Sequence, residues 1–338
     1  MADLQRYFDK FHEDIKLSDI DENPTLRDKR DMLVKELREK LPADVPAFEV
    51  FNQGSYATNT GINPKDGNYD IDVGLLFDCT KSKYPNPVVL KVKVRDALAR
   101  AARNIRIRRH CVTVEYLKDG KPDYHVDLAV YVKRAQDQAL DLAVGREFAD
   151  EANRGWKKSD PKSLVEKIKA RHSGKDGEQF RRSIRYLKRW RDEQLLANDA
   201  LPSIALTCAA YYWFGPYKES APAERYVDSI ALKRFVDSML SNFHDVLHDG
   251  EMASRLQVVL PVEPGDDLMA KMTNSQMKRF KEKIETLCAA LRDAIAETLP
   301  EKACAILAKQ FGDKFPVPKK EETAKSTAAP YVSSGTSA

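Results

Sequence analysis

Three aspartates in the first half of the chain have the spacing of metal ligands. Asp70 and Asp72 alternate within the apolar run YDIDVGLLF, and Asp127 lies in a second run, YHVDLAVYV. Alternate residues of a strand point to the same face, so Asp70 and Asp72 should be neighbours on one side of a sheet. Two adjacent carboxylates repel each other and resist burial unless a cation lies between them. With the third carboxylate, the set predicts a site for two Mg²⁺ ions, with Mn²⁺ as an alternative, suited to in-line phosphoryl transfer.

A glycine-serine turn precedes these strands and is a candidate phosphate site. It lies in the segment FNQGSYATNTG, which contains Gln53, Gly54 and Ser55. Gly54 lets the backbone approach a phosphate closely, and backbone N–H groups with the Ser55 hydroxyl can hold a triphosphate. A Gly-Ser turn or a D-x-D on a strand is common without any such role. Their combination in this order, with each aspartate on a predicted strand, favours a nucleotide site.

The elements that position these residues divide the chain near residue 160. Before this point helical and β-rich patterns alternate, and after it almost every segment has helical spacing. In the first part we expect helices over 24–41 and 87–102, and strands over 48–51, 69–77, 106–117, 124–132 and, as a short edge, 140–144. In the second part we expect helices over 161–171, 177–197, 203–214, 225–247, 274–298 and 300–311. The pattern predicts an α+β fold with domains over 1–160 and 161–318, and a disordered tail over 319–338.

Composition excludes several classes of protein. The 338 residues include 56 Lys+Arg and 52 Asp+Glu, a net charge of only +4, which argues against a protein that coats nucleic acid or binds DNA stably. The N-terminal segment is charged, and the longest apolar run, 201–215, is too short to cross a bilayer. The five cysteines are scattered and never form C-x-x-C, which excludes a disulfide framework or a zinc ribbon. We therefore expect a cytoplasmic protein with no membrane partner.

These motifs resemble a known family. GSYATNT, YDIDVGLLF and HVDLAVYV are similar to the nucleotidyltransferase core of the polymerase-β-like superfamily. FRRSIRYLKRWRDEQ and LPSIALTCAAYY in the helical half resemble the bacterial cGAS/DncV-like nucleotidyltransferases (CD-NTases), the signal synthases of CBASS anti-phage systems. The resemblance implies a nucleotidyltransferase core with N-terminal helices over 1–160, packed against the helical domain. It also implies synthesis of a cyclic oligonucleotide from NTPs with Mg²⁺ and release of pyrophosphate; a cyclic dinucleotide is our first expectation and a trinucleotide our second.

The resemblance further implies a role for each site residue. Asp70 and Asp72 would bind both metal ions and the donor triphosphate, and Asp127 would complete the catalytic metal site and help to activate the acceptor ribose hydroxyl. The residues expected to hold the donor phosphates are Gln53, Gly54, Ser55, Lys188 in RYLKRW and Ser203 in LPSIALT.

The helical spacing around Lys188 agrees with a role beside a triphosphate. Arg181, Arg185 and Lys188 form a basic stripe that borders an apolar one. A solvated charged face is the alternative interpretation. We favour phosphate contact for Lys188 over contact for Arg181 or Arg185.

Two other functions are compatible with the same residues. A linear transferase that acts on RNA or protein would carry the same aspartates, and a non-catalytic nucleotide-binding module would retain the fold. The expected partners are ATP and/or GTP, with UTP or CTP as further options, and an effector that binds the product. In related systems a ubiquitin-like transferase modifies the synthase C-terminus, so a conjugating enzyme acting on the tail over 319–338 is a further expectation.

Three other patterns have simpler interpretations. His244 and His248 have the spacing of the H-E-x-x-H zinc motif, but Asp245 replaces its glutamate, which favours a polar helix surface over a zinc site. The aromatic run 211–214 should be mostly core, with one side chain available to line the groove. The basic run 103–109 should be a surface strand.

Overall fold

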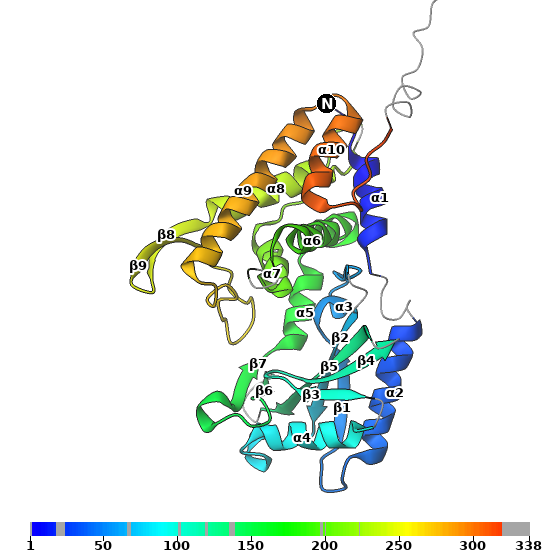
Figure 1. Cartoon of the computed structure of the whole chain (residues 1–338), viewed down its shortest axis with the longest axis vertical. Helices are drawn as coiled ribbons and strands as arrows, with labels where there is room; N and C mark the ends of the chain where they lie inside the picture. Colours follow the sequence, from blue (N-terminus) through cyan, green and yellow to red (C-terminus); the bar gives the residue numbers. More distant parts are fainter. Residues whose placement is uncertain are drawn as a thin grey trace, which may run out of the picture.

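The structure is a computed structural model that describes residues 2–17, 24–65, 69–100, 103–118, 121–134, 139–196, 199, 201–222 and 224–319. A mixed sheet with its covering helices forms one half of the molecule, and a bundle of helices forms the other (Figure 1). The predicted α+β class is confirmed. Of the predicted tail, only Lys319 is among the described residues.

The sheet places a pair of parallel strands at its centre. The five main strands run in the order β1 (Phe48–Asn52), β2 (Tyr69–Phe77), β5 (Lys121–Lys133), β4 (Val112–Lys118) and β3 (Asn104–Ile107). β6 (Leu140–Val144) pairs with β5, and β7 (Gly155–Ser159) pairs with β6. Only β2 and β5 are parallel; every other pairing among these strands is antiparallel.

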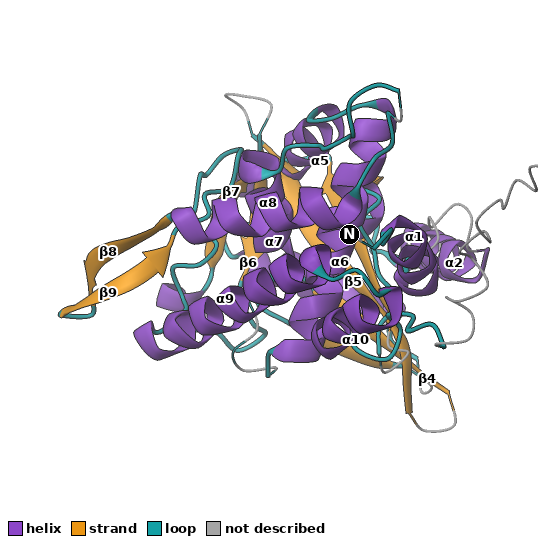
Figure 2. Cartoon of the chain, turned by 90° about the horizontal axis from the view of Figure 1, so that it is seen from above, coloured by secondary structure: helices purple, strands orange, loops and turns teal. Residues whose placement is uncertain are grey.

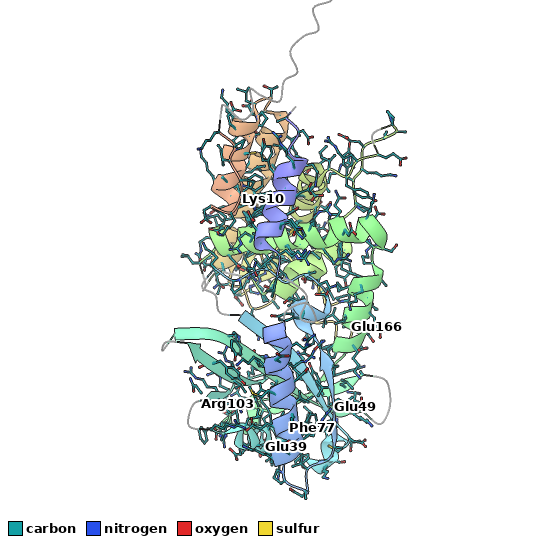
Figure 3. The ribbon with its side chains drawn as sticks, turned by 90° about the vertical axis from the view of Figure 1, so that its right-hand side faces the viewer. Lys10, Glu39, Glu49, Phe77, Arg103 and Glu166 are labelled. Atoms are coloured by element: carbon teal, nitrogen blue, oxygen red, sulfur yellow. The ribbon has the colours of Figure 1, made fainter. Side chains whose placement is uncertain are left out.

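Two helices cover one face of this sheet, and on the other face polar residues lie beside a smaller apolar cluster. α2 (Pro24–Lys40) and α4 (Pro87–Leu98) pack on alternate residues of β2 and β5, such as Ile71 and Val126. α4 begins where the Asn86 side chain accepts a hydrogen bond from the Val88 N–H, with Pro87 in the first turn. In Figure 3 this part of the molecule carries the labelled residues Glu39, Phe77 and Arg103.

The second half is built around one long, buried helix. α6 (Gly174–Gln194) packs against helices on several sides, and its side chains Tyr186, Leu187 and Trp190 are completely buried. The other helices of this half are α5 (Pro161–Ala170), α7 (Ser203–Trp213), α8 (Asp228–Ser241), α9 (Asn274–Ala296) and α10 (Pro300–Phe311). Three short helices lie elsewhere: α3 (Gly54–Ala57), η1 (Lys81–Lys83) and η2 (Glu151–Asn153).

The first helix differs from the predicted division of the chain at residue 160. α1 (Gln5–Ile15) precedes the sheet in sequence, but its buried residues Phe8 and Phe11 belong to the core of the helical half. Figure 1 shows α1 beside α6 and α10, away from the sheet. The apolar face of α1 is thus completed by partners that lie more than 150 residues later.

The predicted helix over 225–247 is wrong at its C-terminal end. α8 stops at Ser241, and β8 (Phe243–His248) and β9 (Glu251–Leu256) form a hairpin that projects from the molecule (Figure 2). Asp249 and Gly250 at its tip both have positive φ, which is typical of a tight hairpin turn. His244 and His248 therefore lie on a strand, and the comparison with a helical zinc motif does not apply.

Two further expectations for the sheet need correction. The predicted strand over 106–117 is two strands, because a turn in which the Arg108 N–H donates to the Cys111 carbonyl separates β3 from β4. β6 is not an edge, since β7 pairs along its free side.

The basic run around β3 is not wholly exposed. Arg103 is buried and donates to Glu36 Oε2 at 2.7 Å, so the first residue of the run 103–109 ties the strand to α2. Across the described part of the chain, no helix combines the length and the apolar character needed to span a membrane.

Candidate active site

The register of the two parallel strands brings the three predicted aspartates together. Asp72 on β2 pairs with Asp127 on β5, and Asp70 pairs with His125. Paired residues of neighbouring strands point to the same face, and alternate residues of one strand do so too. These four side chains therefore share the face of the sheet that α2 and α4 leave uncovered.

Short polar contacts connect the members of this group. Asp70 Oδ1 lies 3.2 Å from His125 Nε2, and Thr113 Oγ1 on β4 donates to Asp127 Oδ1 at 2.5 Å. One ligand atom from each of Asp70, His125 and Asp127 lies within 4.8 Å of the other two. The two carboxylates supply the oxygen ligands that Mg²⁺ or Mn²⁺ prefers.

His125 is a site residue that the sequence analysis missed. The Asp70 carboxylate raises the pKa of His125 through their hydrogen bond. The signal was present in the sequence, because His125 lies two residues before Asp127 on the same predicted strand and must share its face.

The Asp72 carboxylate carries a charge that the surrounding protein does not neutralise. Burial, followed by the neighbouring charges of Asp70 and Asp127, raises the pKa of Asp72 to about 7. The cations His125 and Lys188 oppose this rise but do not cancel it. A cation bound among these carboxylates would relieve the repulsion, which supports the metal site expected from the sequence.

The glycine-serine turn lies against this carboxylate. α3 begins at Gly54, whose φ of +66° is in the left-handed region, and a Cβ at this position would lie 2.0 Å from Asp72 Oδ2. Only glycine fits such an approach. Beside it, Gln53 accepts a hydrogen bond from Tyr131 at 2.9 Å, and its N–H donates to the Asp72 carbonyl at 3.4 Å. The structure thus brings the predicted phosphate-binding turn into contact with Asp72, and Asp70, Asp72 and Asp127 are called the acidic group below.

Lys188 is buried and directed at the loop that follows this turn. Its Nζ donates to the Thr60 carbonyl at 2.9 Å and to Thr60 Oγ1 at 3.0 Å. Burial, then the nearby Arg191 and Arg185, lowers the pKa of Lys188 to about 7, while the charge of Asp72 opposes this change. Lys188 therefore lies within electrostatic reach of the acidic group, and its contact with a triphosphate stays a prediction.

Two further cations of α6 hold the same loop. Arg185 donates to the Asn59 carbonyl at 2.7 Å and to the Gly61 carbonyl at 3.1 Å. Arg189 donates to the Asn63 carbonyl at 2.6 Å. The predicted basic stripe is thus largely a clamp on the loop 59–63.

Ser203 joins the site through an intermediate residue. It is the first residue of α7, and its Oγ accepts a hydrogen bond of 2.5 Å from Arg191. Among charged side chains, Arg191 also has the largest effect on the pKa of Lys188. In the aromatic run, Phe214 is buried in the helical core and Tyr212 is the most exposed ring.

The comparisons with known proteins agree with this geometry. Residues 48–131 match the family model of the nucleotidyltransferase domain of cyclic GMP-AMP synthase DncV-like proteins. The predicted resemblance to the CD-NTases is confirmed.

Solved CD-NTase structures resemble nearly the whole chain. DncV cyclic AMP-GMP synthase of Vibrio cholerae, in complex with the linear intermediate 5′ pppA(3′,5′)pG, aligns with a TM-score of 0.69 at 16% identity, over 93% of this chain and 96% of that one. CdnG of Bradyrhizobium diazoefficiens, in complex with GTP, gives 0.67 at 16% identity over 92% and 96%. CdnC of E. coli MS115-1 with ATP gives 0.66 at 15% identity over 92% and 98%. At this identity the likeness is one of fold.

The DncV-like match does not cover all predicted site residues equally. The matched segment 48–131 contains the acidic group and the glycine-serine turn. Lys188 and Ser203 lie outside it, on helices where the likeness to CD-NTases rests on fold alone.

Proposed function

We propose that the chain is a nucleotidyltransferase that makes a cyclic oligonucleotide, a cyclic dinucleotide in the first instance, from NTPs. The observation that carries the proposal is the convergence of Asp70, Asp72 and Asp127 on one sheet face, in contact with the Gly54 turn. The match of residues 48–131 to a DncV-like nucleotidyltransferase domain supports the same reaction.

The residues of the acidic group would hold Mg²⁺, or Mn²⁺ in its place. Bound Mg²⁺ supplies charge neutralisation and Lewis-acid activation for phosphoryl transfer. In that transfer an acceptor ribose oxygen forms a bond to the α-phosphorus of the donor, and the bond from that phosphorus to the pyrophosphate leaving group breaks. The acceptor hydroxyl would pass its proton to the Asp127 carboxylate, which Thr113 holds in position by a hydrogen bond.

The glycine-serine turn and the α6 clamp would position the donor. Gln53, Gly54 and the Ser55 hydroxyl lie at the start of α3, directly beside Asp72. The loop 59–63 that follows is fixed by Arg185, Lys188 and Arg189. A triphosphate placed there would meet a backbone that is already held in place, which lowers the entropic cost of binding.

The test is a product assay with all four NTPs and Mg²⁺. We expect pyrophosphate release and a nucleotide product that survives phosphatase, because a closed ring has no terminal phosphate. The Asp70→Asn/Asp72→Asn variant should release no pyrophosphate above background. Complete dephosphorylation of the product would instead indicate a linear transferase, and equal pyrophosphate release by the variant, or none by either protein, would contradict the mechanism.

The setting in the cell is part of the proposal. The product would be an anti-phage signal made in the cytoplasm and read by an effector that binds it. The tail over 319–338 would serve as the attachment site of a conjugating enzyme. Truncation after Pro318 should abolish an adduct in cells that carry the whole operon, and an unaffected adduct would contradict this part of the proposal.

A further inference from the structure

A cavity lies between α1 and α6 and extends to the glycine-serine turn. Its volume is about 600 Å³, and its walls come from α1, α6 and the segment 55–61. A cavity of this size fits a small ligand. Asp70, Asp72, Asp127, Lys188 and Ser203 do not line it, whereas Ser55 of the glycine-serine turn does, so the cavity adjoins the candidate active site without containing its carboxylates. Figure 3 labels Lys10, which lies on the wall formed by α1.

Charged side chains of both signs line this cavity. The carboxylates that line it are Asp9, Glu13 and Glu178, whereas the lysines and arginines are Lys10, Lys16, Arg181, Arg182 and Arg185. Three of these cations already face a carboxylate. Lys10 pairs with Asp14 at 2.5 Å, Lys16 lies 3.5 Å from Glu13, and Arg182 pairs with Asp228 at 2.7 Å. Arg181 and Arg185 are therefore the lining cations that no carboxylate pairs with in the described part of the chain, and Asp9 and Glu178 are lining carboxylates that no lysine or arginine pairs with there.

Arg181 is the first of the two cations that lack a carboxylate. It lies on α6, half-buried, and lines the cavity. Among the residues that the structure describes, its guanidinium has neither a hydrogen bond nor an ion pair. Its donors are therefore available to a ligand without breaking an existing contact.

Arg185, one helical turn later, is the second. Only 7% of the residue is exposed, and its partners in the described chain are two backbone carbonyls and His12 Nε2 at 3.1 Å. A guanidinium has five N–H donors, so these three contacts leave two of them for a ligand. Burial, then the charge of Arg181, lowers the pKa of Arg185 to about 10, while the charge of Glu13 opposes this change.

We propose that this cavity binds a small phosphate-bearing anion, held chiefly by Arg181 and Arg185. Two adjacent guanidinium groups present planar arrays of donors that match the oxygens of phosphate, and they favour a ligand with two or more negative charges. Ser55 lines the same cavity, and its hydroxyl can add a neutral donor. Because Arg185 also holds Asn59 and Gly61, a bound anion would contact the clamp that fixes the loop after Ser55.

The test is a binding titration of the full chain with pyrophosphate in the presence of EDTA. Removing divalent metal separates this site from the proposed catalysis, which needs Mg²⁺. We expect one bound pyrophosphate by calorimetry, and roughly tenfold weaker binding by Arg181→Gln, the loss expected for one charge-assisted contact. Arg181→Lys should retain part of the affinity, because it keeps the charge but loses the fork of donors.

The matched control is Lys175→Gln. Lys175 is an exposed cation on the same helix and does not line the cavity, so its removal changes the net charge equally. Its affinity for pyrophosphate should equal that of the wild type. Titrations with inorganic phosphate and with a nucleoside monophosphate distinguish a free phosphate from a nucleotide as the source of the ligand. No binding by the wild type, or equal affinities for wild type and Arg181→Gln in folded protein, would overturn the proposal.

Discussion

At the scale of single residues, the site depends on how closely a backbone can approach a carboxylate. The space between Gly54 and Asp72 is too small for a Cβ, and the positive φ of Gly54 adds a second constraint. These two effects can be separated, because Gly174 has a similar φ of +53° with nothing near its missing Cβ.

Gly54→Ala should abolish nucleotide transfer, since the new methyl group would displace the Asp72 carboxylate or the turn. Gly174→Ala carries only the backbone strain, a cost of about 1 kcal/mol, and should remain active. Pyrophosphate release by the two purified variants measures the difference. Similar activities in both would show that the contact with Asp72 has no role.

Asp72→Asn should stabilise the protein in the absence of metal at pH 8. The pKa of Asp72 in the folded protein is about 7, above its ordinary value of 3.8, so the folded state binds the proton more tightly. Between about pH 4 and 7 the wild type therefore loses stability as the pH rises, and the variant lacks this loss. The difference between a pKa of 3.8 and one of about 7 corresponds to about 4 kcal/mol at pH 8, which is a gain of about 8–16 °C in Tm for a domain of 150–250 residues.

Thermal melts in EDTA at pH 4 and pH 8 test this prediction. The two proteins should differ little at pH 4, because Asp72 is protonated in the folded state and nearly half protonated in the unfolded state. Added Mg²⁺ at pH 8 should stabilise the wild type and leave the variant unchanged. A variant that melts lower than the wild type at pH 8 in EDTA would contradict the prediction.

The residues of the acidic group were predictable because strand alternation follows directly from sequence. The spacing of Asp70, Asp72 and Asp127 places all three on predicted strands, and the same rule would have added His125. Contacts made across the fold were not predictable. Nothing local to Lys188 indicates that its partner is Thr60, because that pairing depends on how α6 crosses the loop.

At the scale of elements, α6 has two functions on two sides. One side packs into the helical core with Tyr186 and Trp190, and the other extends Arg185, Lys188 and Arg189 to backbone carbonyls of the loop 59–63. Buried cations bound to carbonyl oxygens are otherwise costly, so this arrangement indicates that the position of the loop matters.

Lys188→Met should weaken NTP binding as well as stability. Lys91 provides a matched control, because it is also a buried lysine, and its hydrogen bonds go to the carbonyl oxygens of Arg108, Arg109 and Gly145. Both substitutions should cost about 1–3 kcal/mol of folding free energy, since they leave buried acceptors without a donor. Only Lys188→Met should raise the KM for NTP. Equal KM values for the two variants would remove Lys188 from the nucleotide site.

The elements themselves were predicted well wherever one periodicity dominated. β2, α6, α7 and α10 closely match their expected ranges. The hairpin of β8 and β9 was missed because its exposed residues on β8, such as Val246 and Leu247, continue the apolar spacing of α8. The Asp249-Gly250 turn was the signal that should have ended the helix.

At the scale of the whole molecule, α1 completes a core that the rest of the chain cannot close alone. Phe11 is fully buried and packs on Tyr186, Phe311 and Phe315, with ring centroids 5.1–5.5 Å apart. The N-terminal and C-terminal helices therefore share one aromatic cluster.

Phe11→Ala should lower the free energy of unfolding by about 3–5 kcal/mol, the range for a large cavity in a core. Phe148→Ala is the control, since Phe148 is 92% exposed and should cost almost nothing. Urea denaturation measures both. Equal stabilities would show that α1 docks only weakly on the helical half.

The clamp between α6 and the loop 59–63 has a consequence for how nucleotides move. Because α6 donates hydrogen bonds to several carbonyls of the loop, a hinge opening between the two halves would have to break all of these bonds at once. In the enzyme that we propose, the two halves therefore keep a fixed position relative to each other. A linear intermediate would then have to rotate within a site of constant shape to present its other end. The dimensions of that site, rather than a hinge motion, would set the size of the ring that is released.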